Sequence, residues 1–300
     1  MITLSFPHID NLKQVHYAAV LDYVTHSLSA DKRHDLYQHI TQLPGFNYYA
    51  ESDYGWLKSF ILADTATLRE WTNNHANKLR FNHLKDLYLH RFSNGADSFV
   101  DTGKSYNAYT LFDAMDIHVC PYCEHEFLDE VDINGKHKRT LEFDHFYPKG
   151  DNQFPGLAMC FFNLIPSCIP CNKLKLTNPI AANPYDADIE SLTYLYPDIA
   201  PGANMEALSD DDCAINFHPS GDMILNEKNL ALEQRYYPLR SEVHDLLRKK
   251  QQHPDEQLEE MERMGFGTKE QLRHDFFGDP RSLALGKQLH TKMKHDLIGY

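Results

Sequence analysis

Two Cys-x-x-Cys pairs in the sequence have the spacing of a structural metal site. They are Cys120-Pro-Tyr-Cys123 and Cys168-Ile-Pro-Cys171. Each pair places two thiolates across a tight turn, and together they supply the four sulfur ligands of a tetrahedral zinc ion. Because the pairs are far apart in the chain, the ion would clamp the two ends of an inserted element. We therefore expect one structural zinc ion.

Other uses of these cysteines are less consistent with the pattern. A thioredoxin-like redox pair needs only one such motif and a βαβ context, which the flanking sequence lacks. Six cysteines also fit a secreted disulfide set, but pairing within short motifs favours metal ligation in a reducing compartment. Cys160 and Cys213 lie outside the pairs and are expected to be plain thiols. A zinc-stabilised fold without catalysis stays open as an alternative.

Between the cysteine pairs lie residues with the donor types of a hydrolytic metal site. Asp144 and His145 are adjacent, and Asn163 and Asn172 follow. Neighbouring residues of a strand project differently, so the carboxylate can face a metal while the imidazole faces water. A divalent ion with one base can activate water, neutralise charge on phosphorus and stabilise a leaving oxygen. These residues therefore predict phosphodiester hydrolysis.

The elements that position these residues follow from turn signals. Asn134-Gly135 predicts a hairpin turn between strands over 131–133 and 140–143, so a strand is expected to end at Asp144. After it we expect, in order, a Pro- and Gly-punctuated loop, a second strand and the first turns of a helix, over 146–162, 162–167 and 171–176. The expected order is β-β-α.

Helices are expected on both sides of this segment, and the chain is read as α+β and mostly α-helical. Helical spacing covers 8–43, 53–92, 108–115, 229–252 and 255–264. Residues 183–222 are rich in Pro, Gly, Asn and Asp and are expected to be irregular. The expected regions are an N-terminal helical region, a central zinc-bound ββα-metal module and a C-terminal wrap with helices, over 1–104, 105–180 and 181–300.

The composition is that of an ordinary globular protein. Hydrophobic residues make up 42% and charged residues 24%, which excludes an intrinsically disordered chain. No stretch approaches the roughly 18 apolar residues of a membrane helix, and the first residues lack the layout of a signal peptide. No membrane partner is expected, and a cytoplasmic location is the default expectation.

The charge is unevenly distributed. The formal net charge is −14, whereas six Lys and Arg accompany only three acidic residues between Lys136 and Lys175. Lys149, Lys173 and Lys175 cluster around the candidate residues, and the last two fall near the first turn of the expected helix, where backbone amides also favour anions. We expect these three lysines to contact phosphate.

The motifs also resemble a known family. Asp-His, Asn-Leu and Cys-x-x-Cys-Asn-x-x-Lys, in this order and between paired cysteines, resemble the HNH, or His-Me finger, nuclease motif of McrA-like restriction enzymes and many bacterial defence nucleases. The resemblance implies that His145 is the general base, that Asp144 and Asn172 bind one catalytic Mg²⁺ or Mn²⁺ ion, and that Asn163 orients His145 through its side-chain oxygen. These donor types suit such roles.

A narrower resemblance suggests a biological setting. Cys-Pro-Tyr-Cys-Glu and Asp-His-Phe-Tyr-Pro-Lys, within helical flanks, resemble the HNH subunit of Septu-type anti-phage systems and related retron-associated nucleases. That resemblance implies a DNA substrate and an ATPase of the ABC/SMC-like class, or another defence-system subunit, as partner. Self-assembly along the substrate is the alternative. An RNA- or tRNA-cleaving toxin on the same module, and a non-catalytic zinc-binding interaction module, are the other hypotheses.

The acidic balance predicts weak DNA binding by the isolated chain. With a net charge of −14 and only a local basic surplus, we expect weak, salt-sensitive binding to duplex DNA, and efficient cutting only with a partner or after self-assembly. Fluorescence anisotropy of a labelled duplex across a salt titration measures this. Tight, salt-resistant binding by the monomer would contradict it.

Overall fold

The computed structural model describes residues 1–6, 8–93, 99–101, 104–150, 152–204, 209, 212–278 and 286–298. The chain divides into two compact units. One comprises Leu4–Ile117 and Leu128–Pro179, and the other comprises Met1–Thr3, His118–Phe127 and Ile180–Tyr300. Each unit combines helices with small antiparallel sheets, so the predicted mostly helical α+β class is confirmed.

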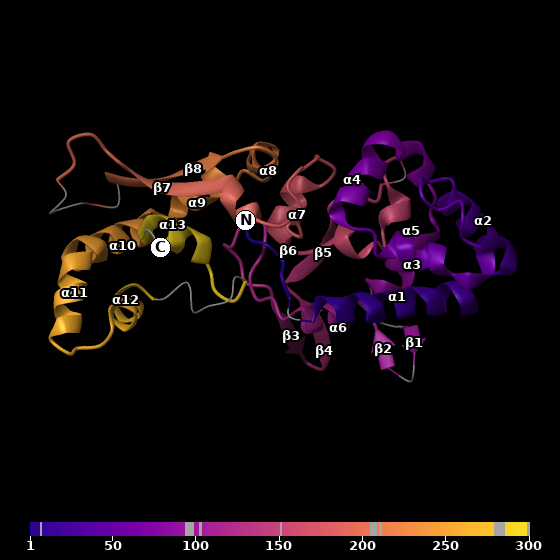
Figure 1. Cartoon of the computed structure of the whole chain (residues 1–300), viewed down its shortest axis with the longest axis horizontal. Helices are drawn as coiled ribbons and strands as arrows, with labels where there is room; N and C mark the ends of the chain where they lie inside the picture. Colours follow the sequence, from indigo (N-terminus) through magenta and orange to yellow (C-terminus); the bar gives the residue numbers. More distant parts are fainter. Residues whose placement is uncertain are drawn as a thin grey trace. The chain divides into compact units, whose positions relative to one another are not determined.

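The first unit contains the candidate catalytic residues. Its helices are α1 (Ile9–His26), α2 (Ala30–Thr41), α3 (Gly55–Ile61), α4 (Thr65–Asn74), α5 (His83–Leu87), α6 (Ala108–Met115) and α7 (Ile169–Lys175). Its strands are β1 (Phe99–Asp101), β2 (Lys104–Tyr106), β3 (Glu130–Ile133), β4 (Lys136–Arg139), β5 (Leu141–His145) and β6 (Leu164–Cys168). A π-helical turn over Tyr88–Phe92 continues α5, and α7 lies against β5 and β6 (Figure 1).

Local capping explains where several helices begin. The Asp64 carboxylate accepts a hydrogen bond from the Thr67 amide at 2.8 Å and so caps α4. Asn107 caps α6 in a capping box, in which its side chain accepts from the backbone and the Thr110 hydroxyl accepts from the Asn107 amide. The helix over 108–115 is therefore found where the sequence predicts it. Between them these helices bury an aromatic core that includes Trp56, Phe60 and Trp71.

The strands of this unit confirm one part of the predicted hairpin and correct another. The turn at Asn134-Gly135 is present and joins β3 to β4. The predicted partner strand over 140–143 is wrong, because the hairpin closes with Lys136–Arg139 instead. Residues 141–145 form a separate strand, β5, which pairs antiparallel with β6. Because the turn has only two residues, pairing starts at Lys136, and the partner strand ends at Arg139, before β5 begins.

The second unit consists of a two-stranded sheet and the C-terminal helices. Its strands are β7 (Thr193–Ile199) and β8 (Cys213–Pro219). Its helices are α8 (Met223–Leu230), α9 (Leu232–Tyr236), α10 (Arg240–Gln252), α11 (Asp255–Arg263), α12 (Lys269–Phe277) and α13 (Thr291–Ile298). Helices α9 and α10 pack on β8, and α13 packs on β7, as the orange and yellow part of Figure 1 shows. None of the described helices is long and apolar enough to cross a membrane.

The predicted irregular stretch over 183–222 is wrong over 193–199 and 213–219, which are strands. Residues 193–199 and 213–219 form an antiparallel pair in which Thr193 lies opposite Pro219 and Ile199 opposite Cys213. Thr193 and Leu195 are buried whereas Tyr194 and Tyr196 are exposed, which is the alternation of a half-buried strand. The predicted helix break at His253-Pro254 is confirmed, because α10 ends at Gln252 and α11 begins at Asp255.

A buried glycine in the loop between β5 and β6 has no room for a side chain. A Cβ atom at Gly156 would lie 2.6 Å from the Phe81 ring and 2.8 Å from the Leu79 carbonyl oxygen. We expect Gly156→Ala to lower the free energy of unfolding by roughly 1–3 kcal/mol, because the loop must shift to relieve this overpacking. Gly150→Ala is the matched control, since its Cβ would meet only the flexible Gln153 side chain. Urea unfolding measures both; equal stabilities of the two variants would contradict the packing argument.

Candidate functional site

The strand pair β5–β6 and helix α7 form a continuous β-β-α segment around the candidate residues. In the antiparallel pair, His145 lies opposite Leu164 and Leu141 opposite Cys168. Helix α7 begins immediately after β6, and the Cys168 side chain caps it by accepting from the Cys171 amide. The order of elements is the one that the sequence predicts. It places the end of β5 and the start of β6 side by side.

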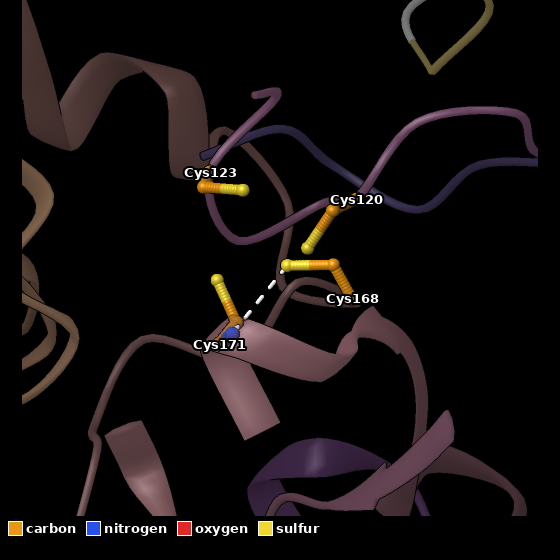
Figure 2. Close-up of side chains that lie close together, drawn as sticks. All are labelled: Cys120, Cys123, Cys168 and Cys171. Carbon is orange, nitrogen blue, oxygen red and sulfur yellow. Dashed lines mark hydrogen bonds between the residues drawn. The ribbon is translucent and has the colours of Figure 1, made fainter. Parts of the chain in front are cut away.

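The four paired cysteines lie close together and are buried. Their ligand atoms all lie within 4.8 Å of one another (Figure 2). Four sulfurs about 2.3 Å from a tetrahedral zinc ion would be about 3.8 Å apart, so the spacing fits. The amide of His125 donates to the Cys123 sulfur and the amide of Cys171 to the Cys168 sulfur, each at 3.4 Å. Such amide donors stabilise thiolates. The predicted four-cysteine group is present in the structure.

The two remaining cysteines lie outside this group. Cys160 and Cys213 are both buried, and neither belongs to the four-cysteine group. The Cys160 thiol donates to the Phe60 carbonyl oxygen at 3.5 Å. Burial raises the pKa of the Cys160 thiol well above its usual value, so it stays protonated.

Asp144 is paired with a lysine that the sequence predicted to contact phosphate. The Lys175 side chain is fully buried, and its ammonium lies 3.0 Å from the Asp144 carboxylate and 2.6 Å from the His145 carbonyl oxygen. Asp144 itself is only 4% exposed. The predicted phosphate contact of Lys175 is therefore wrong, because its charge is turned inward onto β5. A lone charge in such a place would be costly, and the pair removes that cost.

The His145 imidazole lies in a fixed and enclosed position. Its Nε2 is 3.0 Å from the Ala158 carbonyl oxygen, and its Nδ1 is 3.2 Å from the Lys149 ammonium. A carbonyl only accepts, and an ammonium only donates, so Nε2 carries the proton and Nδ1 carries the lone pair. The Tyr88 ring packs edge-on against the imidazole, with the two ring centres 4.4 Å apart. Burial lowers the pKa of His145 well below its usual value, and the positive charge of Lys149 adds a smaller shift in the same direction. The ring is therefore neutral at pH 7.

Asn163 does not orient His145 as predicted. Its side-chain oxygen accepts from the Tyr147 amide at 2.7 Å, and its amide group donates to the carbonyl oxygens of Tyr147 and Leu157. Both nitrogens of the His145 ring are bonded to other groups. The Ala158 carbonyl therefore holds the ring, and Asn163, which is fully buried, holds the loop that carries this carbonyl.

Asn172 and the remaining lysines lie around the same segment. Asn172 is half-buried on α7, and its amide group donates to the Glu142 carboxylate. Lys173 is exposed on the same helix. Lys149 is half-buried, with its ammonium 4.8 Å from the Tyr88 ring centre as well as next to His145. Burial lowers the pKa of Lys149, and the carboxylates of Asp144 and Glu142 oppose that shift.

The donor chemistry at Asp144 and Asn172 fits a hard divalent cation. A carboxylate and an amide oxygen are the ligand types that Mg²⁺ and Mn²⁺ prefer. Among the described residues, the cysteine group is the only set of three or more His, Cys, Asp or Glu side chains spaced for one ion. An ion at Asp144 would therefore need water and substrate among its ligands, as Mg²⁺ usually has. Lys175 already occupies one oxygen of Asp144.

Three contributors to this arrangement were missed in the sequence. The Ala158 carbonyl has no sequence signal, because any residue carries one. Tyr88 donates its hydroxyl to the Phe143 carbonyl oxygen at 3.2 Å, and a tyrosine in a helical apolar pattern predicts only core packing. Glu142 could have been found, because residues two apart on a strand share a face and Glu142 precedes Asp144 by two.

No protein-family model, no curated protein and no solved structure matches this chain.

The cysteine group predicts the metal content of the purified protein. We expect one zinc ion per chain, and we expect Cys168→Ser/Cys171→Ser to lose it and to melt at lower temperature, because a structural zinc site contributes directly to folding. Cys213→Ala is the matched control, since it removes a buried thiol outside the group and should keep the zinc. Elemental analysis and thermal unfolding measure both effects. Zinc retained by the double variant would refute the assignment.

Proposed function

We propose that this protein is a metal-dependent HNH endonuclease that hydrolyses phosphodiester bonds in DNA. The observation that carries the proposal is the His145 imidazole at the end of β5, directly after Asp144, with Nε2 3.0 Å from the Ala158 carbonyl oxygen and Nδ1 3.2 Å from the Lys149 ammonium. The support is the combination of this ring with the β-β-α order and the buried cysteine group. Each feature alone occurs in other proteins, and their conjunction favours a nuclease.

His145 meets one requirement of a general base. A base must be deprotonated at working pH, and the lowered pKa of His145 keeps the ring neutral. The Ala158 carbonyl binds the Nε2 proton, so the lone pair for accepting a proton from water lies on Nδ1. When Nδ1 takes a proton, the same carbonyl stabilises the imidazolium. Ala158 thus supplies the orienting role that the sequence assigned to Asn163.

Lys149 covers the lone pair of His145 in this structure. Its ammonium lies 3.2 Å from Nδ1, and its lowered pKa reflects partial burial. A phosphate group is a stronger acceptor for an ammonium than a neutral imidazole is. A substrate phosphate would therefore draw Lys149 away and leave Nδ1 to water. Lys173, exposed on α7, is proposed as a second phosphate contact.

Two different metals have separate roles in this proposal. Zn²⁺ at Cys120, Cys123, Cys168 and Cys171 is structural. Mg²⁺ or Mn²⁺, held by Asp144 and Asn172, would stabilise the charge on the leaving oxygen. The chain's own part is to place the carboxylate on β5 and the amide on α7, two elements that pack on each other.

The wider setting follows from the resemblance and the charge. We infer a nuclease effector of a bacterial anti-phage system, in the cytoplasm, that cuts foreign DNA. With a net charge of −14, the chain would obtain much of its grip on DNA from a partner ATPase, another defence-system subunit or further copies of itself.

The role of His145 has a direct test. We expect His145→Ala to lower the rate of plasmid nicking by about 10²- to 10⁴-fold with zinc content unchanged, because it removes a positioned base. His145→Gln, which keeps a donor for the Ala158 carbonyl oxygen, should lose the same activity, and thermal unfolding of both variants separates this loss from one of folding. His218→Ala is the matched control, since His218 is exposed on β8. Asp144→Asn and Asn172→Ala should instead shift the Mg²⁺ titration to higher concentration. Asn keeps an acceptor for the buried Lys175.

The outcomes separate the proposal from its rivals. Wild-type nicking by His145→Ala would refute the assignment of the base. A tRNA substrate offered beside the plasmid distinguishes the DNA nuclease from an RNA-cleaving toxin on the same module. Absence of cleavage of either substrate, with Mg²⁺ and Mn²⁺ present and at protein concentrations and low salt that allow self-assembly and DNA binding, would favour a non-catalytic zinc module.

A further inference from the structure

Helix α7 supplies polar groups to the face of β5 that carries its two carboxylates. Glu142 and Asp144 are two residues apart on β5 and so share a face. Asn172 and Lys175 are three residues apart on α7 and so share a side of the helix. Asn172 donates to Glu142, and Lys175 donates to Asp144. The polar side chains of the strand and the helix therefore face one another, and each carboxylate of β5 is bonded to one residue of α7.

The two pairs differ in their burial. Glu142 is exposed and Asn172 half-buried, so water reaches that pair. Lys175 is 0% exposed and Asp144 4% exposed, which leaves the ammonium with the carboxylate and the His145 carbonyl oxygen as acceptors. Lysine is almost never fully buried without a partner. The Asp144 carboxylate is thus already neutralised by a cation of the protein itself.

We propose that Lys175 is a positioning residue that acts as a built-in counter-cation of Asp144 and competes there with the divalent ion. This inference rests on the proposed nuclease function only in taking Asp144 as a ligand of that ion. A fixed positive charge within a few ångströms opposes a second cation strongly where water is excluded. The phosphodiester adds negative charge to the same site. The protein therefore binds its divalent ion weakly when alone and more tightly when DNA is bound.

The decisive experiment measures Mn²⁺ binding without DNA. We expect Lys175→Gln, which keeps an uncharged amide donor in place of the ammonium, to bind Mn²⁺ at least about 10-fold more tightly than the wild type, because it removes one positive charge next to the ligand. Lys173→Gln is the matched control: it removes the same charge from the exposed side of α7 and should change the affinity by less than about 2-fold. Electron paramagnetic resonance of free Mn²⁺ gives the affinities, with zinc content checked for each variant.

A folding readout covers the case in which Lys175→Gln is unstable. The variant removes the ammonium bonded to the Asp144 carboxylate, so we expect it to melt at lower temperature than the wild type and to regain that temperature when Mn²⁺ is added. Unchanged or weaker Mn²⁺ binding would overturn the proposal, and so would a variant that Mn²⁺ fails to stabilise. Because neither readout uses nucleic acid, a protein that shows these shifts but fails to cut DNA under conditions that allow self-assembly would contradict the nuclease proposal and leave the role of Lys175 intact.

Discussion

The buried bond between the Lys175 ammonium and the end of β5 constrains the rest of the candidate site. The ammonium bonds to both the Asp144 side chain and the His145 carbonyl oxygen. It therefore fixes the position of the carboxylate and that of the strand end from which the imidazole projects. Because an unpaired charge at this depth would be strongly destabilising, the helix cannot drift from the strand without breaking the pair. The position of α7, and with it Asn172, follows from this contact.

A second constraint comes from histidines that bind main-chain carbonyls in the loop after β5. His145 holds the Ala158 carbonyl, and His16 on α1 holds the next one, that of Met159, at 2.7 Å. Burial lowers the pKa of His16 to about 4, so both rings are neutral at pH 7. Together with Asn163, they satisfy polar groups of an irregular segment that could not otherwise be buried. Side chains thus supply the hydrogen bonds that a strand ladder would otherwise provide.

The sequence predicted the local features of this fold better than it predicted which strands pair with each other. The turn at Asn134-Gly135, the helix over 108–115 and the cysteine group depend on short motifs, and all three were predicted correctly. The partner of β5 depends on residues 164–168, far along the chain, and no turn motif specifies it. The hairpin of β7 and β8 was missed because Pro and Asp within the segment hid an alternation that Thr193–Tyr196 does show.

The errors within the candidate site have a common cause. Lys175 was expected to contact phosphate because it clusters with other lysines around the motif, and Asn163 was expected to orient His145 because the family resemblance implies it. In the structure both side chains are buried, and each bonds to a backbone carbonyl. Which carbonyls need a donor is known only when the loop is folded, so these roles depend on tertiary structure.

The surface charge near the site also differs from the charge counted along the sequence. Lys175 and Asp144 cancel each other inside the protein. Arg139 is engaged as well, because it donates to the Ser93 carbonyl oxygen at 2.9 Å and stacks on the Tyr109 ring at 4.1 Å. Of the cations that made this segment look basic, Lys173 and Lys138 are exposed. With few outward cations among the described side chains of this segment, little positive charge is available to hold DNA, and this is the physical reason for a partner or further copies in the proposed function.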